Sequence, residues 1–448
     1  MYRTNKRKKL INIFKNYKYI NFLIYIFPFI LITGPALPDI ILTCTAIVLI
    51  YKTYIEKNYE IFNQTWFKVG VLLWLWFIFV SFFAYNNYLS FIDSIIFIRF
   101  IIFILAVQYF LSNNKIRNNT IKIIFVFSIF ITIDSGYQFF NYDSETGFKN
   151  DIFGIEPEGL YGRISGPFKD LVPGSVLTKF FFISLILYSS NLEKYKKITA
   201  LIIFSTIISL IFFSGERVAF ATLLLGILIL FFLPKFRIFI ILCSVFSSLF
   251  IFIVVNSHPI FNDYTIIQST SQHEGLLIQK TFPCKNDANK TCSKKIRMQP
   301  RFIEVVKDFK NSAYGEIYNT ALNMWKDNKF TGVGLNNFSF VCNNFKKYDK
   351  FHKHTDCATH PHNFYIQALA ESGIIGFFIF TSLIVTLIIS ILKSNQETKL
   401  KFIFVISLVV VFWPIISTGS FLKNWHMALV SYLIGICLSN IRSWDKKI

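Results

Sequence analysis

Long runs of apolar residues repeat along the chain and limit its fold more than any other feature. A run of about 18 apolar residues is long enough to cross a bilayer as one α-helix. Such runs occupy residues 18–34, 36–52, 66–84, 90–111, 120–140, 171–190, 198–214, 217–233, 237–256, 363–392, 401–417 and 423–440. Hydrophobic residues make up 54% of the 448, far more than one soluble core would use. The sequence therefore predicts an all-α polytopic membrane protein with about 12 transmembrane helices.

Connections rich in Lys and Arg alternate with connections that lack them. The N-terminal segment and every second connection are basic, whereas the short connections at 33–37 and 85–89 contain no Lys or Arg. Because Lys and Arg concentrate in cytoplasmic connections, we expect both termini in the cytoplasm. The net charge of +21 is then mainly a topology signal, and we expect no nucleic-acid partner. The basic start resembles a secretory signal, but Pro35 makes a poor cleavage context and the apolar run is long for a signal, so we expect the first run to be retained.

Two connections are long. With the N-terminus in the cytoplasm, the number of spans that precede each of them places both on the non-cytoplasmic side. One covers residues 141–170, and the other covers residues 257–362 between helices 9 and 10. The chain then divides into helices 1–9 at residues 1–256, a loop domain at residues 257–362, and helices 10–12 at residues 363–448.

Four cysteines lie in the longer connection, and the other three lie within apolar runs. An even number on an oxidising side of the membrane predicts two disulfides. Of the three possible pairings we favour Cys284–Cys292 with Cys342–Cys357. Zinc binding is the competing interpretation because four histidines lie nearby, but the C-x-x-C and H-E-x-x-H spacings are missing, so we expect no metal.

A polar segment with two histidines leads directly into the tenth apolar run. Pro361 suits the first position of a helix. This would place His362 in the first turn, where the helix dipole disfavours a charged imidazolium. A neutral imidazole at the membrane boundary can act as a general base, so His362 is the candidate base. His360 is its rival, as the base, as a helix cap or as a sugar ligand.

Three arginines need a partner or a ligand. Arg163 and Arg217 lie in short segments next to predicted spans, and guanidinium groups bind phosphate oxygens in pairs. Both are therefore candidates to bind a diphosphate, although Arg217 also suits an anchor that reaches the headgroups. Arg99 lies in the middle of a predicted span, where a cation is costly. We expect it to pair with Asp93 or Asp134, or to contact a substrate.

Four segments together resemble the O-antigen ligase and O-antigen polymerase superfamily of bacterial envelope enzymes. Residues 163–168 are similar to its Arg-x-x-Gly-x-Phe motif, residues 214–217 to its Ser-x-x-Arg turn, residues 332–338 to its Gly-x-Gly-x-x-x-Phe motif, and residues 362–376 to its His-Asn, Gln, Glu-x-Gly-x-x-Gly signature. The segments occur in the family's order and cover a core of about residues 130–380. An acid common in relatives is replaced by Leu171, and an expected Arg before the 324–338 segment is missing, so Arg301 is our substitute for the third cation.

The resemblance implies a metal-independent, inverting glycosyltransferase that needs no cofactor and works on the periplasmic face of the bacterial inner membrane. Its donor would be a glycan on undecaprenyl diphosphate, with Arg163, Arg217 and Arg301 bound to the diphosphate. His362 would deprotonate the acceptor hydroxyl. His360, Gln367, Glu371 and Arg99 would support the site, the middle two either as a structural pair on one helical face or as contacts to the acceptor.

The resemblance leaves several functions open. An O-antigen ligase would use lipid A–core as its acceptor. An O-antigen polymerase would instead join lipid-linked repeat units, and a protein O-oligosaccharyltransferase would modify a protein. A transporter also fits twelve spans, but it predicts symmetric halves and polar groups at the membrane midplane. The distinctive polar residues of this chain instead gather at one face, which favours an enzyme.

Overall fold

The computed structural model is a bundle of long helices. It describes residues 18–143, 147–157, 163–188, 194–262, 265–266, 276–284, 287–298, 309–349, 357–415 and 417–439. Each of the twelve apolar runs contains a helix: α2 (Lys18–Ile30), α3 (Ala36–Glu56), α4 (Thr65–Ser81), α5 (Asn87–Phe110), α6 (Asn114–Phe140), α7 (Pro173–Tyr188), α8 (Lys194–Phe213), α9 (Arg217–Leu230), α10 (Pro234–Ser257), α16 (Phe364–Leu392), α17 (Thr398–Val411) and α18 (Asn424–Leu438). Strands within the described residues form only two small antiparallel sheets.

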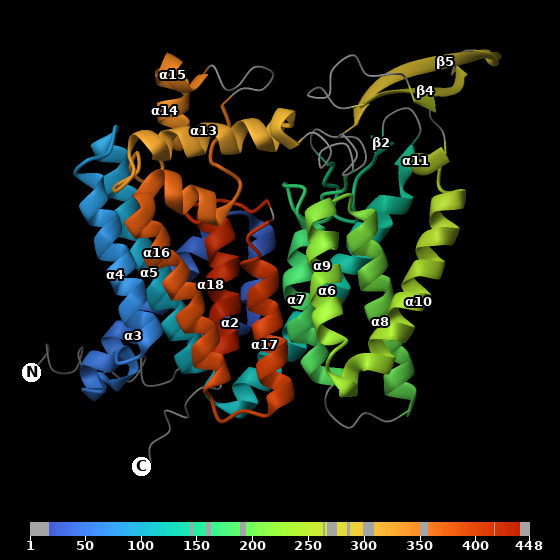
Figure 1. Cartoon of the computed structure of the whole chain (residues 1–448). Helices are drawn as coiled ribbons and strands as arrows, with labels where there is room; N and C mark the ends of the chain where they lie inside the picture. The colour runs from blue at the N-terminus through green and yellow to red at the C-terminus, as the bar shows by residue number, and fades with distance from the viewer. Residues whose placement is uncertain are drawn as a thin grey trace, which may run out of the picture.

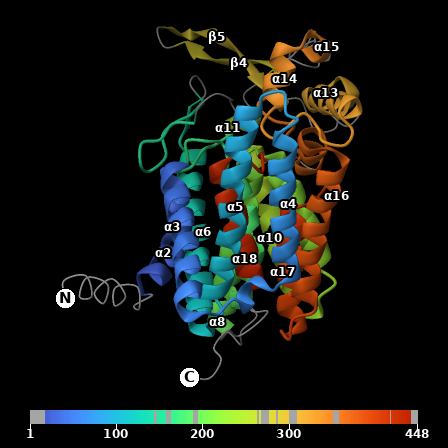
Figure 2. The same ribbon diagram turned by 90° about the vertical axis from the view of Figure 1, so that its left-hand side faces the viewer.

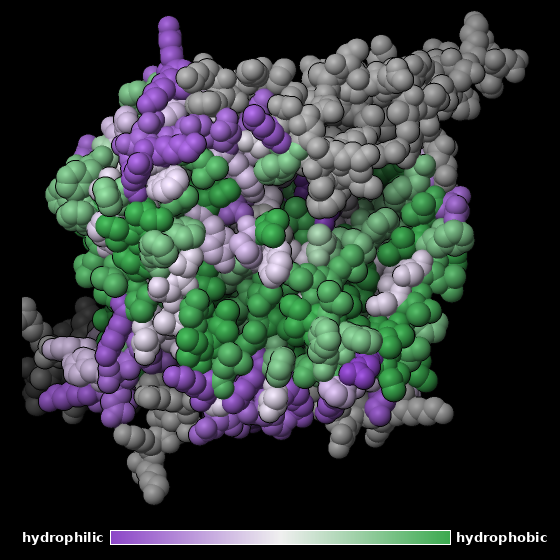
Figure 3. Space-filling view, in the orientation of Figure 1, coloured by the Kyte–Doolittle hydropathy of each residue, from purple (hydrophilic) through white to green (hydrophobic). Residues whose placement is uncertain are grey.

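Six of these helices are long and apolar enough to cross a membrane: α3, α5, α6, α8, α10 and α16. On the face seen in Figure 3, hydrophobic residues form a broad band across the helices, and hydrophilic residues gather at the lower edge and around the top of the bundle. The prediction of an all-α polytopic membrane protein is confirmed. The exact number of membrane spans stays a prediction.

Three short helices cover one end of the bundle, which we call the α13 end (Figures 1 and 2). They are α13 (Ala313–Asp327), α14 (Phe338–Asn344) and α15 (Lys346–Asp349). The same end carries η3 (Phe309–Asn311), α11 (Pro259–Asn262), the paired strands β1 (Tyr142–Asp143) and β2 (Gly147–Phe148), and a sheet of β3 (Thr265–Ile266), β4 (Leu276–Cys284) and β5 (Asp287–Met298).

The helix α13 is amphipathic, and its apolar face builds a small core of its own. Ile317, Ala321 and Met324 are buried at helical spacing, as expected for a helix with one apolar stripe. They pack with residues of α14 and with Ala370 of α16. Cys342 of this core forms a disulfide with Cys357, so the predicted pairing of these two cysteines is present. The side chains of Cys284 and Cys292 lie outside the described part of the chain.

The helix α16 is broken at Gly373, and the loop between α13 and α14, residues 328–337, fills the break. We call it the glycine loop. Gly373 has φ +70°, so its helix hydrogen bonds are replaced by bonds to the loop. The N–H of Val333 donates to Ala370 O (2.9 Å), the N–H of Gly334 donates to Glu371 O (3.1 Å), and the N–H of residue 374 donates to Lys329 O (2.9 Å). The bonds pair backbone groups that would otherwise be buried without partners. The Gly-x-Gly motif follows from the close approach, because Gly332 and Gly334 have φ +67° and +97°, and a Cβ added at Gly332 would lie 2.6 Å from Ala370 O.

The same loop rests on the connection between α4 and α5. The N–H of Tyr85 donates to Val333 O (3.2 Å). The side chain of Asn337 accepts from the N–H of Asn86 at 2.7 Å and donates to its carbonyl at 3.3 Å. Trp76 of α4 donates to the carbonyl of residue 372 at 2.9 Å, beside the break. The first half of α16 is therefore fixed relative to α4 and α5.

Candidate active site

The two histidines of the predicted catalytic motif lie in the segment before α16. Asn363 is the N-cap of this helix, and its side-chain oxygen accepts from the N–H groups of residues 365 and 366 at 3.0 and 3.1 Å. The prediction that the helix begins at Pro361, with His362 in its first turn, is wrong. An Asn side chain is a strong N-cap, and the left-handed φ of +53° at His362 is incompatible with a helix. His362 therefore lies just outside α16.

The connection between α17 and α18, residues 412–423, holds this segment in place. The N–H of Thr418 donates to His362 O at 2.7 Å. The side-chain amide of Asn363 donates to Pro414 O at 2.8 Å. The hydroxyl of Tyr365 donates to the carbonyl of residue 412 at 2.6 Å. The backbone at the candidate base is thus fixed by hydrogen bonds on both sides.

The rings of His360 and His362 face each other, with their centroids 4.1 Å apart. His360 is 5% exposed, and its Nδ1 lies 2.9 Å from the hydroxyl of Thr359. His362 is only half-buried, and its ring lies 6.0 Å from that of Tyr314 in α13. Of the two imidazoles, His362 is therefore the more accessible to a second substrate.

Both imidazoles are held in the neutral form. Burial, and next the positive charge of Lys423, lowers the pKa of His362. Burial, followed by His362 and Lys423, lowers the pKa of His360 to about 3. A neutral imidazole has a free ring nitrogen that can accept a proton. The sequence analysis attributed the neutral form of His362 to the helix dipole, whereas the main cause of its lowered pKa is burial.

Gln367 and Glu371 form a buried pair inside the protein. The amide of Gln367 donates to Glu371 Oε2 (3.0 Å) and to Ser420 Oγ (2.8 Å), and its oxygen accepts from the N–H of Phe421 (3.3 Å). Glu371 also accepts from the N–H of Phe338 at 3.3 Å. Each side chain is 1% exposed. This pair therefore ties α16 to both the 412–423 connection and the glycine loop.

The two segments that carry Arg163 and Arg217 lie side by side. The N–H of residue 164 donates to Ser214 O at 3.4 Å. Glu216, next to Arg217, accepts from the N–H groups of Gly174 (2.6 Å) and Ser175 (3.1 Å) at the start of α7. The charge of Arg163 acts on the Glu216 carboxylate. The segments predicted to hold the two phosphate-binding arginines are thus neighbours in the fold.

Arg99 forms its ion pair with Asp39 rather than with either acid predicted for it, although its charge also acts on Asp93. Its guanidinium donates to Asp39 Oδ2 at 3.0 Å and to Asn424 Oδ1 at 2.8 Å. Asp93 instead accepts from Asn336 at 2.7 Å, and Asp134 accepts from the N–H of residue 152 at 3.2 Å. The ion pair joins α3 to α5, and a signal for it existed in the sequence, since Asp39 is an acid one turn inside an apolar run.

Residues 201–381 match a family model described as O-antigen ligase. Over these residues the chain is similar to that family. The match includes Arg217, the glycine loop, both histidines and the break at Gly373, whereas Arg163 precedes it. No curated protein matches the chain. This match supports the prediction of a multi-pass membrane glycosyltransferase of the ligase and polymerase type.

Lys179 and His426, which the sequence prediction missed, connect the arginine segments to the two histidines. Lys179 of α7 interacts electrostatically with Glu216. His426 of α18 interacts with Lys179, His360 and Lys423. Pairwise interactions thus link Arg163 to Glu216, Glu216 to Lys179, and Lys179 to His426. His426 in turn interacts with His360, whose ring faces that of His362. We call this set of groups the charged row. A lysine inside an apolar run is costly, and this was the signal for Lys179.

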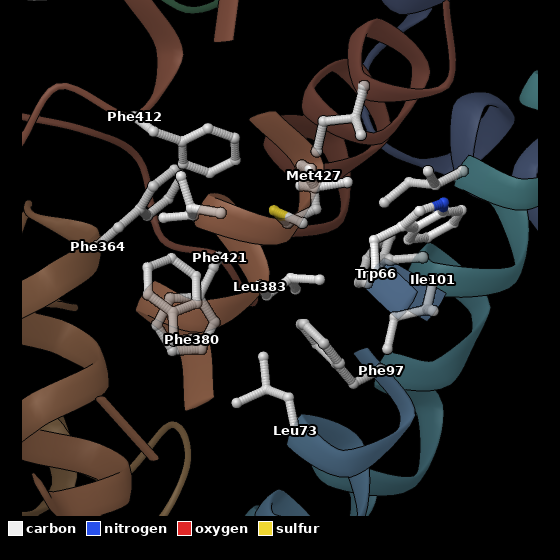
Figure 4. A pocket seen from close by; sticks show the side chains of 15 residues that line it. Trp66, Leu73, Phe97, Ile101, Phe364, Phe380, Leu383, Phe412, Phe421 and Met427 are labelled. Carbon is white, nitrogen blue, oxygen red and sulfur yellow. The ribbon is translucent and has the colours of Figure 1, made fainter. Parts of the chain in front are cut away.

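An apolar cavity of about 40 Å³ lies between the helices α4, α5, α16 and α18 (Figure 4). Its walls are the side chains of α4, α5, α16 and α18 together with Phe412 and Phe421. Phe364, the first residue of α16, lines this cavity and also contacts the ring of His426, with the centroids 5.6 Å apart. Phe364 thus brings the apolar cavity next to the histidine end of the charged row.

Two further predictions concern metal binding and the third cation. Within the described part of the chain, no group of three or more His, Cys, Asp or Glu side chains is placed to hold a metal ion. Arg301, the predicted third cation, lies outside the described residues.

Proposed function

We propose that this protein is an O-antigen ligase-type enzyme that transfers a glycan from undecaprenyl diphosphate to lipid A–core. The reaction would take place at the α13 end, on the periplasmic face of the inner membrane. The observation that carries the proposal is the row of groups that joins Arg163 and Lys179 to a neutral, half-buried His362. Such a row combines binding of an anionic leaving group with a base for the acceptor.

The proposed reaction is a single displacement with inversion at the anomeric carbon. His362 accepts the proton of the acceptor hydroxyl, and the hydroxyl oxygen forms a bond to the anomeric carbon. The bond from that carbon to the diphosphate oxygen breaks, and its electron pair leaves with the diphosphate. Fixed cations lower the barrier because negative charge builds up on the leaving oxygen. Arg163 and Arg217 are proposed to bind this diphosphate.

His362, and not His360, is proposed as the base because the two rings differ in access. His360 is buried and has Thr359 at its Nδ1, whereas His362 is half-buried. Gln367 and Glu371 are proposed to support the site by positioning the start of α16. Their polar atoms already bond to protein groups, so we assign them no substrate contact.

The test combines a gene deletion with a transfer assay. A strain that lacks a ligase should accumulate lipid-linked polymer and make lipopolysaccharide without O-antigen on gels. A core that carries one repeat unit would instead identify a polymerase, and unchanged lipopolysaccharide would contradict both. Purified protein should transfer the glycan from undecaprenyl diphosphate to lipid A–core without added metal.

A further inference from the structure

Lys179 places a positive charge inside an apolar helix. It lies six residues after Pro173, the first residue of α7, which is about 9 Å along the helix axis. Its ammonium group donates to the hydroxyl and the carbonyl of Ser175, one turn back towards the α13 end. The side chain therefore points from within the bundle towards the candidate site.

The charges around Lys179 do not cancel. Among the described residues, Glu216 is the carboxylate whose charge acts on Lys179. The charge of Arg163 acts on the same carboxylate, which also accepts two backbone N–H groups of α7. One carboxylate thus serves two cations in a place where it is itself only 7% exposed. Buried charge without a full counter-charge is costly, so this arrangement suits an additional anion.

Lys179 also faces the side of the row that carries the candidate base. Its charge acts on His426, and His360 interacts with the same ring. An anion bound at Lys179 would therefore lie between the Arg163 segment and the histidines. Lysine is a compact cation on a flexible stem, which suits one phosphate group and does not require bidentate geometry.

We propose that Lys179 binds the donor phosphate nearest the lipid chain, while Arg163 binds the phosphate nearest the sugar. This inference rests on the proposed function. The order follows from position along α7, because a lipid chain extends into the membrane and Lys179 lies deeper in the bundle than the start of that helix. Lys179 is thus a residue that distinguishes a diphosphate lipid from a monophosphate lipid.

The experiment measures equilibrium binding of undecaprenyl diphosphate, undecaprenyl monophosphate and inorganic pyrophosphate to the purified full chain in nanodiscs. Lys179→Met should weaken binding of undecaprenyl diphosphate by roughly ten- to a hundredfold, the range for one charge-assisted hydrogen bond. Binding of undecaprenyl monophosphate should change by much less. Lys179→Arg, which keeps the charge, should recover most of the loss.

The matched control is Lys52→Met, which removes a helix-borne lysine that pairs with Glu56 in α3 and should leave all three affinities unchanged. Equal losses for both lipids, or no loss for the diphosphate, would overturn the assignment. Pyrophosphate that binds Lys179 as tightly as the lipid would overturn the lipid-linked source. Because the readout is binding, a wild-type protein that binds the diphosphate lipid but transfers no glycan would reject the proposed function and leave the Lys179 site intact.

Discussion

Replacing Gly373 by Ala should detach the glycine loop from α16. The residue has φ +70°, and an added Cβ would lie 2.1 Å from the carbonyl oxygen of Phe330. The loop backbone cannot yield cheaply, because it is hydrogen-bonded to α16 on both sides of the break. The substitution therefore forces either the loop or the helix to move.

The cost has two parts. Gly373 has φ +70° and ψ −173°, a conformation open almost only to glycine, and a residue with a Cβ costs about 1–3 kcal/mol there. Moving the loop also breaks the three backbone hydrogen bonds made by Val333, Gly334 and residue 374, each worth about 0.5–1.5 kcal/mol. The expected loss in the free energy of unfolding is therefore about 3–7 kcal/mol. The buried Glu371, which accepts from the N–H of Phe338, would lose that partner as well.

Hydrogen exchange and thermal unfolding in detergent would measure this effect. The amides of Val333 and Gly334 should exchange much faster in Gly373→Ala, and the unfolding temperature should fall. The control is Gly136→Ala in α6, where an added Cβ meets nothing within 4 Å and helix propensity should improve by up to about 1 kcal/mol. If both variants unfold alike, with unchanged exchange at the loop, the proposed latch between loop and helix is wrong.

Three further predictions concern the candidate active site and the core between α13 and α14. His362→Ala should reduce transfer by roughly 10²–10⁴-fold at normal protein levels, with a milder effect for His360→Ala, and near-wild-type transfer by His362→Ala would refute the assignment of the base. The neutral base loses activity as pH falls through the pKa of His362, and Lys423 lowers that pKa; Lys423→Met should therefore raise it and shift the acidic limb of the pH–rate profile to higher pH, and a limb that stays in place or moves down would contradict this. Replacing Cys342 and Cys357 by Ser opens a link across 15 residues and should destabilise the α13–α14 core by about 3 kcal/mol, seen as faster proteolysis of α14 than in the wild type.

The positions of the helices could be predicted because apolar length is a local property of the chain. Each of the twelve runs contains a helix. The predicted helix start at Pro361 is three residues too early, because Asn363 is a better cap than the sequence rule for Pro361 allows for. The favoured pairing Cys342–Cys357, across 15 residues, is present.

Contacts between distant helices could not be predicted in the same way. Asp39 and Arg99 lie 60 residues apart, and nothing in either run gives the rotation of one helix against the other. Lys179 and His426 are isolated polar residues in two separate apolar runs, and only the packing of the helices brings them into contact with the motif residues. The resemblance found the motif residues, whereas the residues that connect them depended on the fold.

The hydrogen bonds around His362 show that the segment matched by the family model depends on residues outside it. The family match ends at residue 381, yet the backbone of His362 and the side chain of Asn363 bond to the 412–423 connection, beyond that limit. The glycine loop inside the match likewise rests on Asn86 and Tyr85, far before it. A fragment of residues 201–381 would therefore contain the motifs without the supports that shape them. The matched segment is therefore not the unit of folding, which extends at least from α4 to the 412–423 connection.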